Sequence, residues 1–228
     1  MPVIREKIKT LLGEIEALEK SSARDNTKIC LVIVTKNVTE ERILEAYEAG
    51  VRDFGENRVQ ELLQKKPNLP KDIRWHFIGH LQSNKVKDLA GQVVLIHSLD
   101  SVHLAKELEK VSGKMNIITE VLIQVNTSRE FTKHGFKLDE IEDVVGEMTR
   151  FAHLRIRGLM TIGPLTDRTE EIRNSFILLR NLQKKMRASY PDLDWSELSM
   201  GMSDDFPLAI QEGSTILRVG RAVFGERK

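Results

Sequence analysis

The stretch that decides the fold is Ile29-Cys30-Leu31-Val32-Ile33-Val34-Thr35-Lys36. Its apolar run has the length of a strand, and apolar residues on both faces are typical of a strand that is covered on both sides. Thr39 follows as a predicted helix cap, with Glu40 and Glu41 in the first turn, where the helix dipole favours acids. A buried strand followed by a capped helix predicts a parallel sheet with crossover helices.

The same alternation of short apolar runs and longer amphipathic segments continues to the end of the chain. It predicts about eight strands separated by helices, and a further helix over residues 4–18 before the first strand. Eight such units are the count of a TIM barrel, so we predict one α/β domain over residues 1–228, a (β/α)8 barrel with an extra N-terminal helix. An open doubly wound sheet is the alternative. The predicted strands are 29–35, 52–54, 74–78, 93–97, 117–125, 154–160, 197–199 and 215–219.

Two later helix starts carry specific signals. Asp167-Arg168-Thr169-Glu170 resembles a capping box, which predicts a long helix that continues through Met186. Ser203 is the predicted N-cap of a short helix that ends at Gly213. Both segments lie after a predicted strand, in the loops that supply the side chains at the mouth of a barrel.

Composition and charge limit the partners of the chain. It has 228 residues, a formal net charge of +1 and one cysteine. Such a charge creates no broad field for nucleic acid or anionic lipid, and no apolar stretch approaches the roughly 20 residues that cross a bilayer. Cys30 cannot form an internal disulfide and is interpreted as a core thiol rather than a reactive one. The N-terminus is charged and periodic, unlike a secretory segment, so together with the charge and the missing apolar span it predicts a cytoplasmic protein without nucleic-acid or membrane partners.

A barrel gathers the residues at the carboxyl ends of its strands on one face, where TIM-barrel active sites lie. Lys36 follows the first predicted strand and shares the parity of Cys30, Val32 and Val34, so its side chain should point to the same side as theirs. Partial desolvation there would favour the free amine, the form that attacks an aldehyde. The plainer interpretation is a lysine that extends to solvent at a strand end.

Two glycine-containing segments suit a phosphate group. Residues 198–203 and 217–222 follow the last two predicted strands, the region where TIM barrels often bind phosphate. Gly220 would let the backbone approach the ligand, Ser203 would add a hydroxyl and Arg221 a charge. A plain helix cap is the alternative role of Ser203, and the two roles are compatible.

Three further polar side chains, Asn57, His80 and Thr161, also follow predicted strands. A single histidine at a strand end is more often a hydrogen-bonded structural residue than a catalyst, so His80 keeps both interpretations. The histidines lack metal-binding spacing, and neither a metal site nor a certain catalytic residue is assigned. The pair Asp204-Asp205 would oppose phosphate binding unless both side chains turn outward.

Six segments in this order, over nearly the whole chain, resemble the YggS/PROSC family of pyridoxal phosphate homeostasis proteins. The resemblance implies a fold like the N-terminal barrel of alanine racemase, with pyridoxal 5′-phosphate (PLP) as cofactor. It implies that PLP is held as a Schiff base on Lys36. The segments that carry it are 34–36, 54–61, 75–85, 157–160, 198–205 and 218–225.

The resemblance also implies the surroundings of the cofactor. Phosphate contacts are expected around Ser203, Gly220 and Arg221, and Asn57 and Met200 are expected near PLP. His80 and Thr161 are added as residues at the mouth of the site because both follow predicted strands.

The resemblance further implies that Arg218 faces the pyridine nitrogen of PLP. An arginine there keeps its proton, so the ring would be a weak electron sink, unsuited to demanding carbanion chemistry. The chain departs from the family at Thr35, where serine is usual, at His80, where proline is usual, and at Arg221, often a small hydroxyl residue. The first two changes could alter the mouth of the site.

The function expected from this resemblance is intracellular PLP homeostasis with little or no turnover. Only ten residues follow Arg218, so we expect no second domain to supply an acid or base, and we expect a monomer. PLP-dependent apoenzymes are the expected recipients. The first alternative is a PLP enzyme, such as an amino-acid racemase, with His80 or Lys133 as the proton-transfer group. The second is a barrel that binds another phosphate ester without a covalent bond.

Overall fold

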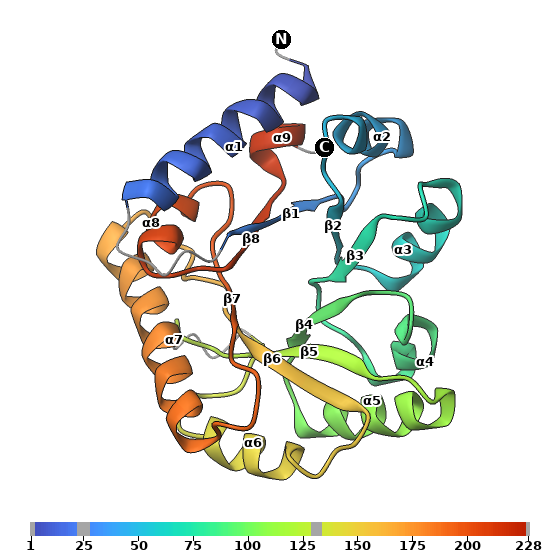
Figure 1. Cartoon of the computed structure of the whole chain (residues 1–228), viewed down its shortest axis with the longest axis vertical. Coiled ribbons are helices and arrows are strands. Elements are labelled where there is room, and N and C mark those ends of the chain that lie inside the picture. Colours follow the sequence, from blue (N-terminus) through green and yellow to red (C-terminus); the bar gives the residue numbers. More distant parts are fainter. Residues whose placement is uncertain (1–2, 22–27, 129–133, 227–228) are drawn as a thin grey trace.

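The sheet is a closed ring of parallel strands, paired in sequence order with β8 next to β1 (Figure 1). The closing ladder pairs Cys30 with Ile216 and Ile33 with Val219. This closure excludes the open doubly wound sheet and confirms the predicted TIM barrel. The computed structural model describes residues 3–21, 28–128 and 134–226. The strands are β1 (Cys30–Val34), β2 (Asp53–Glu56), β3 (Arg74–Phe77), β4 (Leu95–Leu99), β5 (Thr119–Gln124), β6 (Leu154–Met160), β7 (Glu197–Ser199) and β8 (Ile216–Val219).

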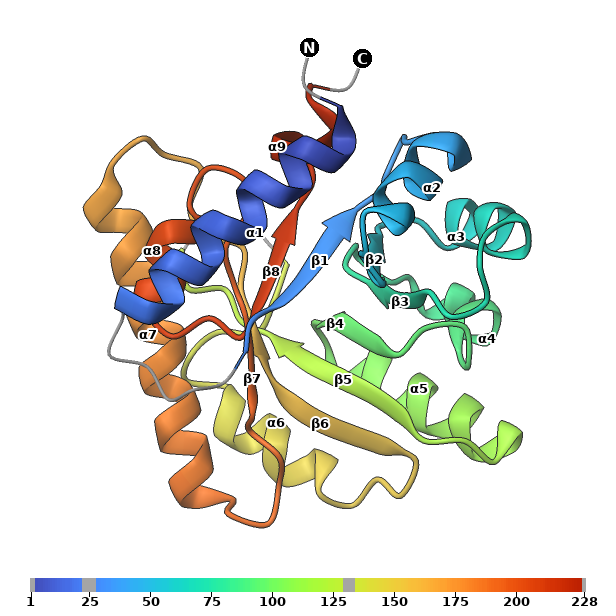
Figure 2. The ribbon, with the colours of Figure 1, turned by 45° about the horizontal axis from the view of Figure 1, so that its top comes forward.

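The helices surround this ring, as Figures 1 and 2 show. The predicted N-terminal helix is confirmed as α1, which buries Ile4, Ile8, Leu11 and Ile15 on one face. That face packs against α2, α8 and α9. The helices are α1 (Ile4–Ser21), α2 (Glu40–Glu48), α3 (Val59–Lys65), α4 (Val86–Leu89), α5 (Val102–Met115), α6 (Ile141–Met148), α7 (Thr169–Ser189), α8 (Phe206–Gln211) and α9 (Arg221–Phe224), with 3-10 turns η1 (Lys66–Asn68) and η2 (Ser83–Lys85).

Two apolar clusters fill the molecule. The larger one lies between the strands and the helices, and the smaller one fills the barrel interior with residues from five strands. Cys30 is half-buried and packs against the smaller cluster, so the inward parity expected for the first strand is confirmed. The smaller cluster consists of Val32, Leu95, Leu122, Met160 and Ile216.

Several predicted boundaries were wrong by a few residues. The fourth strand was placed at 93–97, but β4 covers Leu95–Leu99, because its pairing runs from Leu95 beside His76 to Leu99 beside Ile123. The second strand was placed at 52–54, whereas β2 extends through Glu56. The sixth and seventh strands have the predicted bounds.

Both predicted caps in the second half were wrong. The N-cap of α8 is Asp205, whose carboxylate accepts a hydrogen bond from the Met202 amide, and not Ser203. The N-cap of α7 is Arg168, without a side-chain capping hydrogen bond, so residues 167–170 form no capping box. Thr39 is the N-cap of α2, also without such a bond. Ser101 does cap α5, since its hydroxyl accepts a hydrogen bond from the Leu104 amide.

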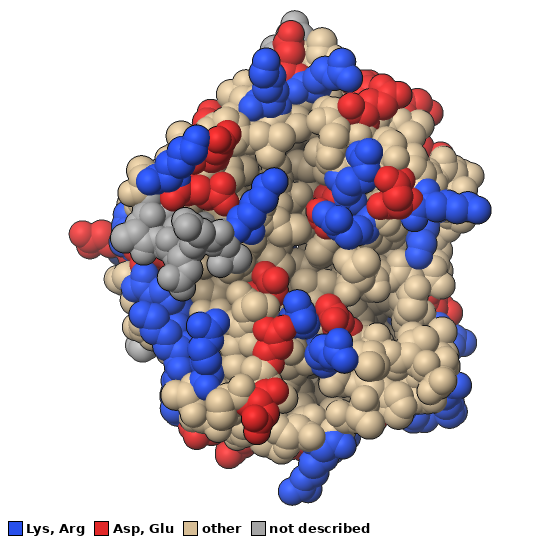
Figure 3. All heavy atoms as spheres, in the orientation of Figure 1, with Lys and Arg blue, Asp and Glu red and all other residues tan. Residues whose placement is uncertain are grey.

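The face of the barrel seen in Figure 3 carries lysine and arginine side chains interspersed with acidic ones. This mixture agrees with the net charge of +1. Among the described residues, no helix has both the length and the apolar character needed to cross a bilayer.

Candidate functional site

A pocket of about 610 Å³ is lined by residues that follow several strands of the barrel. This is the end at which TIM-barrel sites are built. Seven of the residues singled out in the sequence line it. They are Lys36, Asn57, His80, Ser203, Arg218, Gly220 and Arg221, and further lining residues include Val34, Asn37, Ile78, Gly79, Gln124, His134, Ile162 and Met202.

Met200, expected near the cofactor, and Thr161, expected at the mouth of the site, do not line the pocket. Both are fully buried. Met200 belongs to the larger apolar cluster. The Thr161 hydroxyl donates to the Val125 carbonyl at 2.8 Å, while its own carbonyl accepts a hydrogen bond from Arg218 at 2.9 Å. Thr161 therefore contributes to the pocket through the orientation of Arg218.

Lys36 is held by the ordered backbone on both sides of it. The Thr35 hydroxyl lies 2.6 Å from Glu56 Oε1, and the Asn37 amide donates to Glu61 Oε1 at 2.6 Å. Asn37 has a φ of 55°, in the left-handed region that asparagine tolerates. The chain turns sharply just after β1, with Lys36 at the turn.

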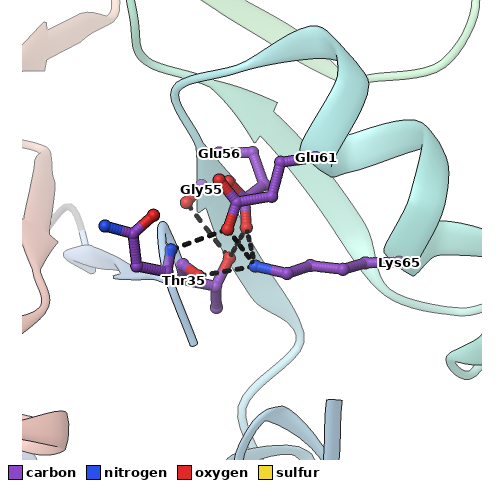
Figure 4. A network of polar contacts seen from close by, with 6 residues as sticks. Thr35, Gly55, Glu56, Glu61 and Lys65 are labelled. Atoms are coloured by element: carbon purple, nitrogen blue, oxygen red, sulfur yellow. Dashed lines mark hydrogen bonds and ion pairs between the residues drawn. The ribbon is translucent and has the colours of Figure 1, made fainter. Parts of the chain in front are cut away.

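The centre of this network is the ammonium of Lys65, shown in Figure 4 with its acceptors. It donates to the Thr35 carbonyl at 2.8 Å, to Glu56 Oε1 at 2.8 Å and to Glu61 Oε1 at 2.6 Å. Lys65 and Glu56 are both buried, and burial raises the pKa of Glu56 while the contacts with Lys65 and Thr35 oppose the rise. A buried ion pair of α3 and β2 thus supports the loop that carries Lys36.

Arg218 is a buried cation facing the pocket from β8. Its Nη1 donates to Ser199 Oγ at 2.6 Å and its Nη2 to the Thr161 carbonyl. No described carboxylate forms an ion pair with it, and burial lowers the pKa of its guanidinium to about 10, whereas the charge of Asp205 acts in the opposite direction. A buried guanidinium without an anion favours a hydrogen-bond acceptor or negative charge in the pocket.

The loops after β7 and β8 lie against each other. The Ala222 amide donates to Ser203 Oγ at 3.3 Å, so the predicted phosphate segments do meet. Arg221 forms an ion pair with the exposed Asp204, and Asp205 turns inward instead of outward. Asp204 is thus paired with a cation, whereas the Asp205 carboxylate accepts a hydrogen bond from the neutral Met202 amide.

His80 lies at the rim of the pocket with a carboxylate behind it. Its Nδ1 lies 2.7 Å from Asp100 Oδ2, and its ring stacks on that of His134 with 4.0 Å between the ring centroids. His134 Nδ1 lies 3.7 Å from the same carboxylate oxygen. Asp100 and His134 were not singled out from the sequence, because they follow β4 and β5 and meet His80 only in the folded barrel.

Glycine is required where the β3 loop enters the site. A Cβ atom on Gly79 would lie 2.2 Å from the carbonyl oxygen of Asn57, which is far inside van der Waals contact. The close approach brings the loops after β2 and β3 together and so positions Asn57 in the pocket. Asn57 Oδ1 is buried and has no hydrogen-bond partner among the described residues.

The chain matches the family described as alanine racemase, N-terminal domain, over residues 10–228. It is 42% identical over 224 residues to the pyridoxal phosphate homeostasis protein of Aquifex aeolicus, covering 98% of each chain. It is 38% identical to the protein of that name from Helicobacter pylori, covering 97% of this chain and 98% of the other.

Solved structures with the same fold also match the chain. PipY of Synechococcus elongatus with PLP bound superposes with a TM-score of 0.86 at 35% identity, covering 97% of this chain and all (100%) of the other. An alanine racemase of Corynebacterium glutamicum shares the fold alone, with a TM-score of 0.73 at 15% identity over 98% of this chain and 61% of that one. The chain belongs to the alanine racemase N-terminal-domain family and, within it, to the pyridoxal phosphate homeostasis proteins.

Proposed function

We propose that this protein binds PLP in the pocket at the carboxyl ends of the strands, through a Schiff base on Lys36, and serves PLP homeostasis. The observation that carries the proposal is the presence of Lys36 and the buried Arg218 in one pocket. An amine can bond covalently to the aldehyde of PLP, and a fixed guanidinium suits the lone pair of the pyridine nitrogen. The PLP bound to PipY, a relative at 35% identity, supports it.

The residues present fit the parts of PLP. The cofactor carries a phosphate, and the loops after β7 and β8 offer the Ser203 hydroxyl and the backbone at Gly220. Arg221, although paired with Asp204, lines the same part of the pocket and adds a positive charge. The unpartnered Asn57 Oδ1 offers an acceptor that a ligand or water could satisfy.

The same residues suit a carrier better than an enzyme. Bound PLP supplies an electron sink, and its strength depends on the protonation of the pyridine nitrogen. Even with a pKa lowered to about 10, Arg218 keeps its proton at neutral pH and so cannot transfer one to that nitrogen. Lys36 would hold the cofactor covalently, Arg218 would orient the ring, and the loops after β7 and β8 would hold the phosphate. Transfer of PLP to apoenzymes is the corresponding role.

One observation favours a second candidate, a PLP-dependent racemase or related enzyme. The Asp100 carboxylate fixes the imidazole of His80 at the rim of the pocket, and an oriented imidazole is a competent proton-transfer group. Lys133, the other group considered for this role, lies outside the described residues. Steady turnover of an amino acid by the PLP-loaded protein, lost in His80→Ala, would support the enzyme. Absence of turnover would support the carrier role instead.

A spectrophotometric titration with PLP tests the proposed function. We expect a Schiff-base absorption band in the parent protein and its loss in Lys36→Ala. Lys87→Ala is the matched control, because Lys87 is an exposed lysine outside the pocket, and it should retain the band. Equal bands in all three proteins would contradict the assignment of Lys36. Phosphate-ester binding by Lys36→Ala, with no band in the parent, would support a non-covalent phosphate-binding barrel instead.

A further inference from the structure

A continuous line of buried polar side chains crosses the barrel interior and ends at the pocket. It runs through Arg218 on β8, Ser199 on β7, His97 on β4, His76 on β3 and Asp53 on β2. Strands β4 and β7 are not neighbours in the ring, so the contact between His97 and Ser199 spans the interior. All five residues are buried, and only Arg218 lines the pocket.

Each step of this line has hydrogen-bond length. Arg218 Nη1 lies 2.6 Å from Ser199 Oγ, and Ser199 Oγ lies 2.8 Å from His97 Nδ1. His97 Nε2 lies 3.0 Å from His76 Nδ1. His76 Nε2 lies 3.1 Å from Asp53 Oδ1. An unbroken connection therefore joins the floor of the pocket to the carboxylate on β2.

The two ends of the line fix the direction of every hydrogen bond. A guanidinium only donates and an ionised carboxylate only accepts. At one end Ser199 Oγ must accept from Arg218, which leaves its hydroxyl hydrogen for His97 Nδ1. At the other end His76 Nε2 must donate to Asp53, so a neutral His76 accepts at Nδ1. His97 is then an acceptor at Nδ1 and a donor at Nε2, and both ends lead to this same assignment.

The charges agree with this assignment. Burial lowers the pKa of His97 well below its usual value, as do the nearby His76 and Arg218, so the ring is neutral at physiological pH. Hydrogen bonds from His76 and Arg74 outweigh the burial of Asp53 and lower its pKa to about 2, so the carboxylate is ionised. The line therefore has a cation at one end, an anion at the other and the neutral His97 between them, the polarity that a one-way chain requires.

The opposite tautomer of His97 would disrupt two contacts. With its hydrogen on Nδ1, His97 would donate to Ser199, and the hydroxyl hydrogen of Ser199 would lose its acceptor. His97 Nε2 would then present a lone pair to the lone pair of His76 Nδ1 at 3.0 Å. Both defects would be buried, where an unsatisfied polar group is costly.

We propose that Ser199, His97, His76 and Asp53 form a one-way hydrogen-bond relay that holds Arg218 in a single orientation toward the ligand. Arg218 has five N–H donors. The relay and the Thr161 carbonyl fix its orientation through Nη1 and Nη2. The four relay residues are positioning residues, since only Arg218 reaches the pocket. The role in ligand binding rests on the proposed function, whereas the relay itself is a property of the folded chain.

The relay can be tested without ligand by nitrogen-15 NMR of the histidine side chains in the purified protein. We expect His97 and His76 to be neutral Nε2–H tautomers at neutral pH, and we expect Ser199→Ala to shift the Nδ1 resonance of His97. Assignment of either ring as the Nδ1–H tautomer, or as an imidazolium, would overturn the relay whether or not the protein binds PLP.

Its role in the site is tested by PLP affinity. Ser199→Ala should raise the dissociation constant of PLP about tenfold or more, because Arg218 loses an anchor that involves a charged donor. Ser199→Thr keeps the hydroxyl and should restore binding, which a general loss of packing would not allow. His103→Gln, at an exposed histidine of α5, is the control and should leave affinity unchanged.

The outcomes separate the two proposals. Failure of the parent protein to bind PLP would contradict the proposed function, while the tautomers would still decide the relay. Normal binding by the parent together with unchanged affinity in Ser199→Ala would overturn the positioning role alone. Circular dichroism of each variant confirms that it is folded before its affinity is compared.

Discussion

The ammonium of Lys65 donates a 2.8 Å hydrogen bond to the backbone carbonyl of Thr35, the residue that precedes Lys36. A side chain at the end of α3 thus fixes the first residue after β1. Because Lys65 is buried with Glu56, the position of Lys36 depends on an ion pair that lies behind the pocket and not within it.

Replacement of this lysine should therefore affect both stability and the site. Lys65→Met would leave the Glu56 carboxylate buried without its cation, and loss of one partner of a buried pair typically costs about 3–5 kcal/mol. We expect the free energy of unfolding to fall by about 3 kcal/mol, measured by urea denaturation. In the variant that remains folded, the Schiff-base band of Lys36 should also be weaker.

Lys20→Met provides the control for this prediction. Lys20 forms an ion pair with Glu16 at 2.7 Å, but both side chains are exposed on α1. Solvent screens such pairs, so its stability should stay at the parent value. Equal losses of unfolding free energy in the two variants would show that the contribution of the Lys65 pair to stability does not depend on its burial.

Gly79→Ala should disturb the pocket directly. The new Cβ atom would lie 2.2 Å from the Asn57 carbonyl oxygen, so the loops after β2 and β3 would have to separate. We expect weaker PLP binding and a lower melting temperature. Gly13→Ala, in the exposed middle of α1 with open space around the new atom, should instead stabilise the protein by up to about 1 kcal/mol. A Gly79→Ala protein with parent affinity would contradict the close approach.

The sequence was sufficient for the barrel and for the position of Lys36. Both depend on local signals, namely the apolar runs and the parity of residues along the first strand. Both predictions are correct although several predicted strand ends differ from the observed ends by up to two residues. The loops after β7 and β8 were also identified, because parallel strands necessarily deliver their loops to the same face.

Other features could not be predicted from one sequence because they depend on contacts between distant segments. The Lys65 ammonium that contacts Thr35 and Glu56 comes from α3, and His97 contacts a serine 102 positions later. The α8 cap was misassigned because Ser203, Asp204 and Asp205 are all good capping residues, and the fold selects the last of them. The side chain of Met200 lies in the larger apolar cluster, and its expected place near PLP stays a prediction.

Stability below neutral pH should reflect the buried His97. Its pKa is lowered well below the ordinary 6.5 in the folded protein, so below that pH the unfolded chain binds one more proton than the folded one. The contribution is fully present above pH 6.5 and is lost as the pH falls, by about 1.4 kcal/mol per pH unit. Urea denaturation of the parent and of His97→Gln at several pH values measures it. A steeper decline in the variant would contradict the neutral, buried ring.

Cys30 should react slowly with alkylating reagents. Burial, with further contributions from Asp53 and Glu197, raises the pKa of its thiol to about 12, and the thiolate is the nucleophile. We expect negligible modification by iodoacetamide at mildly alkaline pH in the folded protein, and rapid modification once the chain is unfolded in urea. Rapid labelling of the folded protein, followed by mass spectrometry, would show that Cys30 is more accessible or more acidic than its place in β1 implies.

The central claim is that Lys36 carries PLP. The most direct measurement is borohydride reduction of the PLP-loaded protein, followed by proteolysis and mass spectrometry of the peptides. The account predicts one dominant pyridoxyl adduct on Lys36, absent from Lys36→Ala and retained in Lys87→Ala. An adduct spread over surface lysines, or no adduct on Lys36, would contradict it.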